Sequence, residues 1–134
     1  MVYLDTNVLV YSVVNIDNNK NFKSTQLIKK LIEDDYLILS PLNIQELAYT
    51  LSKLKMEPIK IFEISELFNN FCLNEITCEI LSQSISIAQE LNFYNNFSDI
   101  VHLLFAQKYA QKLITFDKDF NLLKNIAKIE IEVL

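Results

Sequence analysis

Four acidic residues interrupt apolar segments of the sequence. Two of them closely follow apolar runs that have the length of short buried strands, and two lie in the first turns of predicted helices. They are, in that order, Asp5 and Asp117, then Glu46 and Asp99. A cluster of four carboxylates without histidine or cysteine is a ligand set that Mg²⁺ or Mn²⁺ prefers and zinc does not. A bound divalent cation relieves the repulsion among carboxylates, activates water and stabilises a phosphate undergoing in-line displacement.

Each of these acids also has a simpler interpretation when it is taken alone. Asp5 and Asp99 could be helix N-caps, Glu46 a solvated side chain and Asp117 a turn residue. We favour the joint interpretation because ligands of parallel sheets bind outside the carboxyl ends of the strands. Two acids at strand ends of one sheet would lie at that edge together.

The elements that must position these acids alternate between strand and helix. Short apolar runs predict strands at 2–4, 36–39, 113–115 and 129–133, with a further short strand near 75–77. Helical periodicity predicts helices at 8–14, 22–35, 41–54, 59–71, 79–91 and 99–110, a short helix within 116–127, a turn at 15–21 and a loop at 92–98. This alternation without hairpins is typical of a three-layer α/β/α sandwich with a central, mainly parallel sheet. We expect residues 1–134 to form a single domain.

Composition limits the classes of function. The 134 residues carry a formal net charge of −5 and include no glycine, which excludes glycine-rich phosphate loops. A negative net charge is unusual for a protein that binds nucleic acid through its whole surface, so such a role requires a local site or metal ions. No apolar stretch is long enough to span a membrane and no secretory signal is visible, so we expect no membrane association and a cytoplasmic location. Cys72 and Cys78 are expected to be buried thiols.

Four segments resemble, in order, the motifs of PIN-domain ribonucleases, most closely the VapC-type toxins of bacterial type II toxin–antitoxin pairs. The segments are LDTNVLVY, SPLNIQELAYTL, NNFSDIVHLLFAQKYA and LITFDKDF. The resemblance covers essentially the whole chain, and its most specific parts are the first and the last segment. It implies a PIN-like fold and a Mg²⁺-dependent endoribonuclease that hydrolyses RNA phosphodiester bonds, with Mn²⁺ as an alternative ion.

The resemblance also implies site residues and a partner. Its metal-binding and catalytic acids would be Asp5, Glu46, Asp99 and Asp117. Polar neighbours would support these carboxylates or hold water; they are Thr6, Asn7, Ser40, Thr115 and Asp119. A cognate antitoxin is the implied protein partner, and RNA is the implied substrate. The family commonly has a glycine where this chain has Ala110-Gln111, so we expect a longer or differently capped helix end there.

Other residues near these motifs could also take part. His102 lies one helical turn after Asp99, and we expect it to be a hydrogen-bonded supporting residue and not a general base. Phe93, Tyr94 and Phe97 could stack on unpaired bases, although packing against the core is the preferred interpretation.

Two surface features point to binding partners. The predicted helix 59–71 has more apolar residues than one buried face requires. This helix could complete a homodimer or receive an antitoxin helix, or it could be an ordinary central helix. We expect the protein to form a homodimer. Seven lysines are candidate phosphate contacts, although a solvated face is the preferred interpretation; they are Lys20, Lys23, Lys29, Lys30, Lys53, Lys55 and Lys60.

Two alternative functions remain open at this point. The first is a PIN-like domain that binds RNA or a protein without catalysis. The second is a phosphatase with Asp5 as the nucleophile, which would need an acid two residues later, where this chain has Asn7.

Overall fold

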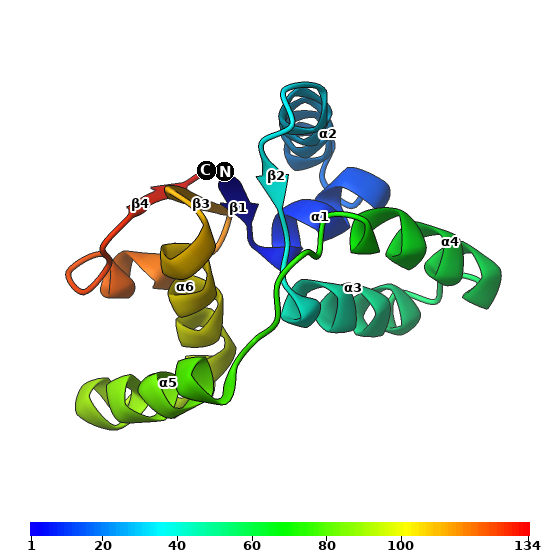
Figure 1. The fold of residues 1–134 in the computed structure, drawn as a ribbon. Coiled ribbons are helices and arrows are strands. Elements are labelled where there is room, and N and C mark those ends of the chain that lie inside the picture. Colours follow the sequence, from blue (N-terminus) through cyan, green and yellow to red (C-terminus); the bar gives the residue numbers. More distant parts are fainter.

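A four-stranded, all-parallel sheet forms the centre of the computed structural model, which describes residues 1–134 (Figure 1). The strand order is β2-β1-β3-β4. The strands are β1 (Val2–Leu4), β2 (Leu37–Ile38), β3 (Lys112–Thr115) and β4 (Glu130–Val133). In the central strand, Tyr3 pairs with Ile38 on one side and with Leu113 on the other. The predicted fold class, an α/β/α sandwich around a mainly parallel sheet, is confirmed.

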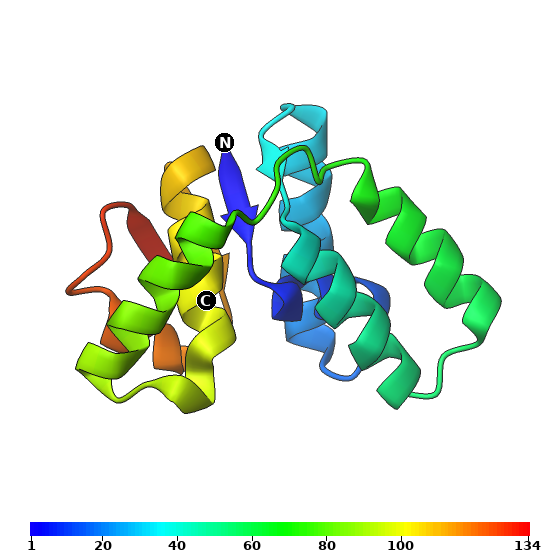
Figure 2. The same ribbon diagram turned by 60° about the horizontal axis from the view of Figure 1, so that its bottom comes forward.

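Helices cover both faces of this sheet (Figures 1 and 2). The α-helices are α1 (Thr6–Val13), α2 (Asn18–Glu33), α3 (Pro41–Lys53), α4 (Pro58–Asn69), α5 (Cys78–Leu91) and α6 (Phe97–Tyr109). Two short 3₁₀ helices complete the fold, η1 (Tyr94–Asn96) and η2 (Lys118–Leu123). In Figure 1, α5 and α6 lie below β3 and β4, and the group α1 to α4 lies on the right-hand side. No helix is both long and apolar enough to cross a membrane.

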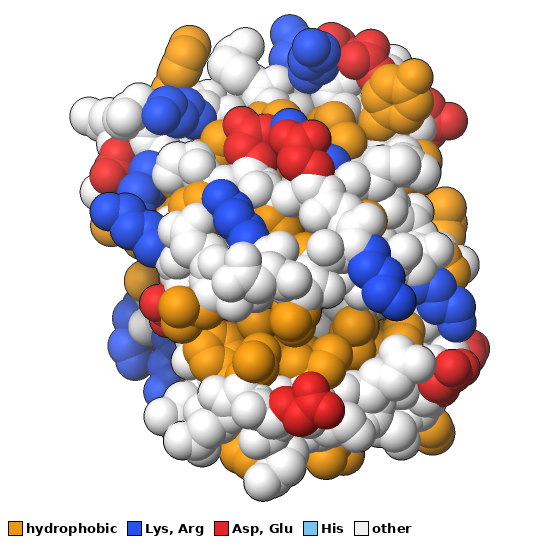
Figure 3. All heavy atoms as spheres, turned by 90° about the vertical axis from the view of Figure 1, so that its left-hand side faces the viewer, with side chains coloured by type: hydrophobic (Ala, Val, Ile, Leu, Met, Phe, Trp, Pro, Cys, Tyr) orange, Lys and Arg blue, Asp and Glu red, His pale blue; other side chains and the backbone are white.

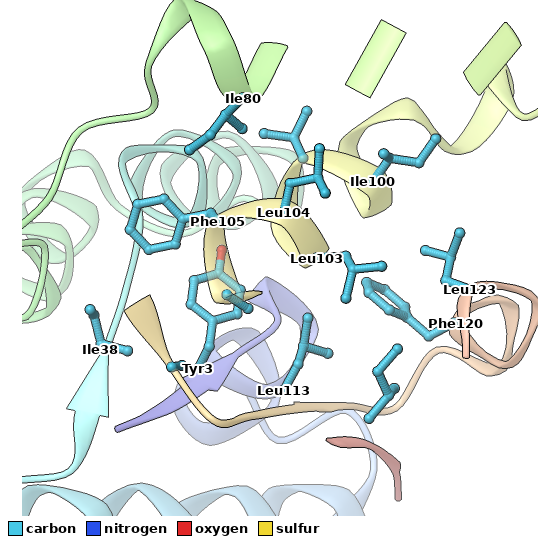
Figure 4. Packing of buried hydrophobic residues seen from close by; sticks show 14 of the residues in the cluster. Tyr3, Ile38, Ile80, Ile100, Leu103, Leu104, Phe105, Leu113, Phe120 and Leu123 are labelled. Atoms are coloured by element: carbon cyan, nitrogen blue, oxygen red, sulfur yellow. The ribbon is translucent and has the colours of Figure 1, made fainter. Parts of the chain in front are cut away.

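Each face of the sheet has its own hydrophobic core. Successive strand residues point to opposite faces, so Tyr3 packs with α5 and α6, whereas Leu4 packs with α1 to α4. In β3, Leu113 likewise belongs to the core with α5 and α6, and Ile114 belongs to the core with α1 to α4. Figure 4 shows Tyr3 and Leu113 below the side chains of α6, including Phe105. The two cores hold the carboxyl ends of β1 and β3 side by side, which fixes the positions of the segments that follow them.

Two predicted boundaries were wrong because a side chain caps a helix earlier than the apolar pattern begins. The segment 75–77 is not a strand: the hydroxyl of Thr77 accepts the N–H of Ile80 and starts α5. The turn at 15–21 is shorter than predicted, because the carboxylate of Asp17 accepts the N–H of Lys20 and α2 begins at Asn18.

Three further expectations need correction. The predicted loop 92–98 contains η1 and the first two residues of α6, Phe97 and Ser98. The helix predicted for 99–110 ends one residue earlier, at Tyr109, and its C-cap residue Ala110 is extended with φ of −134°. Cys78 is exposed and Cys72 half-buried, so the prediction of two buried thiols was wrong; both are free.

Candidate metal-binding active site

A cavity of about 540 Å³ is lined by all four of the predicted acids. Asp5 follows β1, Asp117 follows β3, Glu46 lies on α3 and Asp99 lies in the first turn of α6. The fold therefore brings together four carboxylates that are far apart in the sequence. They meet at the carboxyl ends of two neighbouring parallel strands, where ligands of such sheets bind.

The carboxylate of Asp5 is held by side chains and does not cap a helix. Asp5 occupies the N-cap position of α1, yet its side chain makes no capping hydrogen bond. Instead, Oδ2 of Asp5 accepts hydrogen bonds from Thr115 Oγ1 at 2.6 Å and Asn7 Nδ2 at 2.7 Å. The amide of Asn7 also donates to Thr115 Oγ1 at 3.1 Å. Thr115 accepts the backbone N–H of Asp117 at 2.9 Å, so one hydroxyl connects the two strand-end acids.

Glu46 is held through one of its two oxygens. Its Oε2 accepts from Thr6 Oγ1 at 2.6 Å and contacts His102 Nε2 at 2.8 Å. Thr6 is fixed in turn by Asn43, whose amide donates to its hydroxyl oxygen at 3.1 Å and to the carbonyl of Leu4 at 3.0 Å. Asn43 is also the third residue of α3 and forms a reciprocal capping box with Ser40. The start of α3 is therefore tied to the end of β1.

A buried chain of hydrogen bonds supports Glu46 from behind. Ser40 Oγ lies 2.8 Å from the hydroxyl of Tyr3, and that hydroxyl contacts Nδ1 of His102. His102 is 1% exposed and reaches Glu46 with its other ring nitrogen. Ser40 therefore acts on the site through Tyr3 and His102 and touches no carboxylate of the cavity. Tyr3 was not among the site residues predicted from the sequence. Its signal was a hydroxyl group at a buried strand position, where phenylalanine would fill the core without a polar atom.

His102 offers a nitrogen near two carboxylates, but hydrogen bonds occupy both of its ring nitrogens. Ligand atoms of Asp5, Glu46 and His102 all lie within 4.8 Å of one another. Since one nitrogen contacts Tyr3 and the other Glu46, we assign His102 as a positioning residue and not as a metal ligand.

Asp99 and Asp117 line the cavity outside that tight group, and each is held by local contacts. Asn96 donates through one amide nitrogen to Asp99 Oδ2 at 3.1 Å and to Asp119 Oδ2 at 3.0 Å. Asp117 Oδ1 accepts the backbone N–H of Asp119 at 2.8 Å and caps η2. Asp119 itself is exposed and does not line the cavity. Asn96, which sequence reasoning missed, stands three residues before Asp99.

The electrostatics of the cavity favour a cation. Burial raises the pKa of Asp5, although His102 and the hydroxyl of Thr115 oppose this. Burial also raises the pKa of Asp99 to about 6, helped by the negative charges of Asp5 and Asp117. For Glu46, burial is the largest single cause and acts in the same direction, but the hydrogen bond and charge of His102 and the hydrogen bond from Thr6 together outweigh it, and the pKa is lowered. A divalent cation among these oxygens would favour their ionised forms, and four carboxylates fit Mg²⁺ or Mn²⁺.

The aromatic residues before Asp99 pack mainly against the protein. Phe93 and Phe97 are half-buried and contact the core of the α5–α6 face. Tyr94 is exposed, and its hydroxyl donates to Gln89.

The family model for the PIN domain matches residues 2–126, so the chain belongs to the PIN-domain family. Its fold is similar to that of VapBC2 from Rickettsia felis bound to a promoter DNA fragment, with TM-score 0.70, 16% identity and coverage of 99% of this chain and 98% of the other. It is similar to FitAcB from Neisseria gonorrhoeae, with TM-score 0.68, 20% identity and coverage of 98% and 96%. It also resembles VapC20 of Mycobacterium tuberculosis, described as a sarcin-ricin loop cleaving toxin, with TM-score 0.64, 14% identity and coverage of 92% and 95%. At these identities the structures share the fold. No curated protein matches this chain.

Proposed function

We propose that this PIN-domain protein is a Mg²⁺-dependent endoribonuclease that hydrolyses phosphodiester bonds of RNA, and that it is the toxin of a toxin–antitoxin pair. The observation that carries the proposal is the convergence of Asp5, Glu46, Asp99 and Asp117 on one cavity at the strand ends. Family membership supports the ribonuclease class. The description of VapC20 as a sarcin-ricin loop cleaving toxin supports the toxin role.

In this proposal the four acids hold Mg²⁺, and Mn²⁺ can take its place. When bound, the cation supplies Lewis acidity that activates water and neutralises charge on the reacting phosphate. Thr115 and Asn7 keep the Asp5 carboxylate aimed at the cavity, and Thr6 does the same for Glu46. In the overall reaction, an oxygen of water joins phosphorus, one P–O ester bond breaks, and the leaving ribose oxygen takes a proton.

The test of this proposal is cleavage of a mixed pool of single-stranded RNA in water enriched in the heavy oxygen isotope. With Mg²⁺ we expect products that end in a phosphate monoester carrying one heavy oxygen, and with excess EDTA we expect no cleavage. Products that end in 2′,3′-cyclic phosphate, or cleavage that persists in EDTA, would contradict a metal-dependent hydrolysis. Those products would indicate attack by the neighbouring ribose hydroxyl.

Two protein partners are part of the proposal. An antitoxin segment would cover α4, where only Phe68 is buried while Ile59, Phe62 and Leu67 are each about 60% exposed. A second copy would cover the face seen in Figure 3, where apolar side chains gather. That face includes a hollow of about 330 Å³ between α5, α6 and the segment after η2. Light scattering of the purified protein should give the mass of a dimer, and a monomeric mass at micromolar concentrations would contradict the homodimer.

A further inference from the structure

The ammonium group of Lys20 is held by two aromatic rings. Its Nζ lies 4.7 Å from the ring centroid of Tyr11 and 5.4 Å from that of Phe116. The same nitrogen donates a hydrogen bond to the hydroxyl of Tyr11 at 3.3 Å. The two rings meet edge to face with centroids 5.3 Å apart. These contacts restrict a side chain that is otherwise flexible, so the positive charge has a defined position.

This position adjoins the acid-lined cavity. Tyr11 is itself one of the residues that line the cavity. Phe116 directly precedes Asp117, and its backbone N–H donates to the side-chain oxygen of Asn7 at 3.2 Å. The rings that hold Lys20 therefore belong to the two segments that carry the strand-end acids, so the ammonium and the carboxylates are placed by the same local structure.

Lys20 has no carboxylate partner. The lysines that form ion pairs are Lys29, with Glu33, and Lys112, with Glu130 and Glu132. The nearest acid in the sequence, Asp17, uses its side chain to accept the backbone N–H of Lys20 as a helix cap. The charge of Lys20 is therefore available to an external anion.

The expected substrate needs such a charge. The chain has a formal net charge of −5 and contains twelve lysines and arginines against seventeen acids, so its overall field repels RNA. A metal ion among the four acids would neutralise the phosphate that reacts, but not the neighbouring phosphates of the same strand. We propose that Lys20, oriented by Tyr11 and Phe116, forms a subsite that binds a backbone phosphate next to the scissile bond. This inference rests on the proposed ribonuclease function.

The test compares Lys20→Gln with Lys29→Gln, which makes the same change of charge on the same helix nine residues away from Lys20. Binding of a fluorescein-labelled, mixed-sequence single-stranded RNA is followed by fluorescence anisotropy in EDTA, which prevents turnover. We expect Lys20→Gln to weaken binding about 3- to 10-fold and to reduce the slope of log K against log salt by about 0.7, the value for one phosphate contact with a single strand. Lys29→Gln should change binding less than about 2-fold.

A second variant keeps the charge of Lys20 and both rings, and removes one contact that orients the ammonium group. Tyr11→Phe keeps the ring and removes only the hydroxyl that holds Lys20, so it should fold normally and weaken binding to a smaller extent. Equal binding by wild type and Lys20→Gln, or equal losses in both lysine variants, would overturn the subsite. If the wild type still cleaves RNA in that case, the proposed function stands without the subsite. If the wild type neither binds nor cleaves RNA, the proposed function fails as well.

Discussion

The Asp5→Asn variant should lose RNA cleavage by about 10³-fold or more, a change of roughly 4 kcal/mol in activation free energy. The loss is expected because Asp5 lines the acid-lined cavity together with the other three acids, and an amide is a poor ligand for Mg²⁺ where a carboxylate is required. The fold should be retained, since the carbonyl oxygen of asparagine can accept the hydrogen bonds that Asn7 and Thr115 donate to Asp5 Oδ2. Initial rates on single-stranded RNA with Mg²⁺ measure the effect.

Thermal melting in EDTA provides the accompanying check on folding. Burial raises the pKa of Asp5, which means that the ionised carboxylate is unfavourable at this position without a cation. Asp5→Asn should therefore melt at the same temperature as the wild type or at a higher one. Asp34→Asn, an exposed substitution at the end of α2, is the matched control and should keep full activity. Wild-type rates in a folded Asp5→Asn protein would exclude Asp5 from catalysis.

The His102→Leu variant should lower both the free energy of unfolding and the affinity for Mn²⁺. Leucine cannot bond to Glu46 Oε2 or to the hydroxyl of Tyr3, and a buried polar group left without its partner costs about 1–3 kcal/mol. Loss of a group that orients a metal ligand typically reduces metal affinity by about 10- to 100-fold. Urea denaturation and Mn²⁺ titration measure the two effects.

The His102→Gln variant tests whether His102 acts by orienting Glu46. The glutamine amide can still donate to a carboxylate, so His102→Gln should recover part of the Mn²⁺ affinity that His102→Leu loses. A role in packing alone predicts lower stability in both variants with unchanged Mn²⁺ affinity. That result would contradict the assignment of His102 as a positioning residue.

The positions of Asp5 and Asp117 after two strands could be predicted because their signal is local. Asp5 and Asp117 stand at the ends of short apolar runs, and a parallel sheet places such ends at one edge. The signal for the start of α3 was also local, since Ser40 and Pro41 form a capping pattern in the sequence. In the structure Ser40 is the N-cap and Pro41 is the first residue of α3. The placement of Glu46 followed from counting residues along that helix.

The support of Glu46 could not be predicted, because it depends on contacts between elements. Tyr3 on β1, His102 on α6 and Glu46 on α3 meet only when the sheet is formed and both layers are packed. The periodicity of α6 marked His102 as lying on the same face as Asp99 but did not identify its partners. Asn96 was assigned to a loop, so its bridge between two acids had no local signal.

The errors in element boundaries have a different cause. Thr77 and Asp17 start helices by accepting backbone N–H groups, and both stand before the apolar pattern of their helix becomes visible. A search for capping side chains would have corrected both starts. The sequence Glu75–Thr77 was interpreted as a strand because three residues are too few to distinguish an extended cap from a strand.

The central claim is that the four carboxylates form a site for a divalent cation, and calorimetric titration with Mn²⁺ tests it most directly. The wild-type protein should bind Mn²⁺ in the millimolar range or more tightly, and Asp34→Asn should bind it equally well. Asp5→Asn should show no binding over the same range. Absence of Mn²⁺ binding by the wild type, or unchanged binding by Asp5→Asn, would contradict the account.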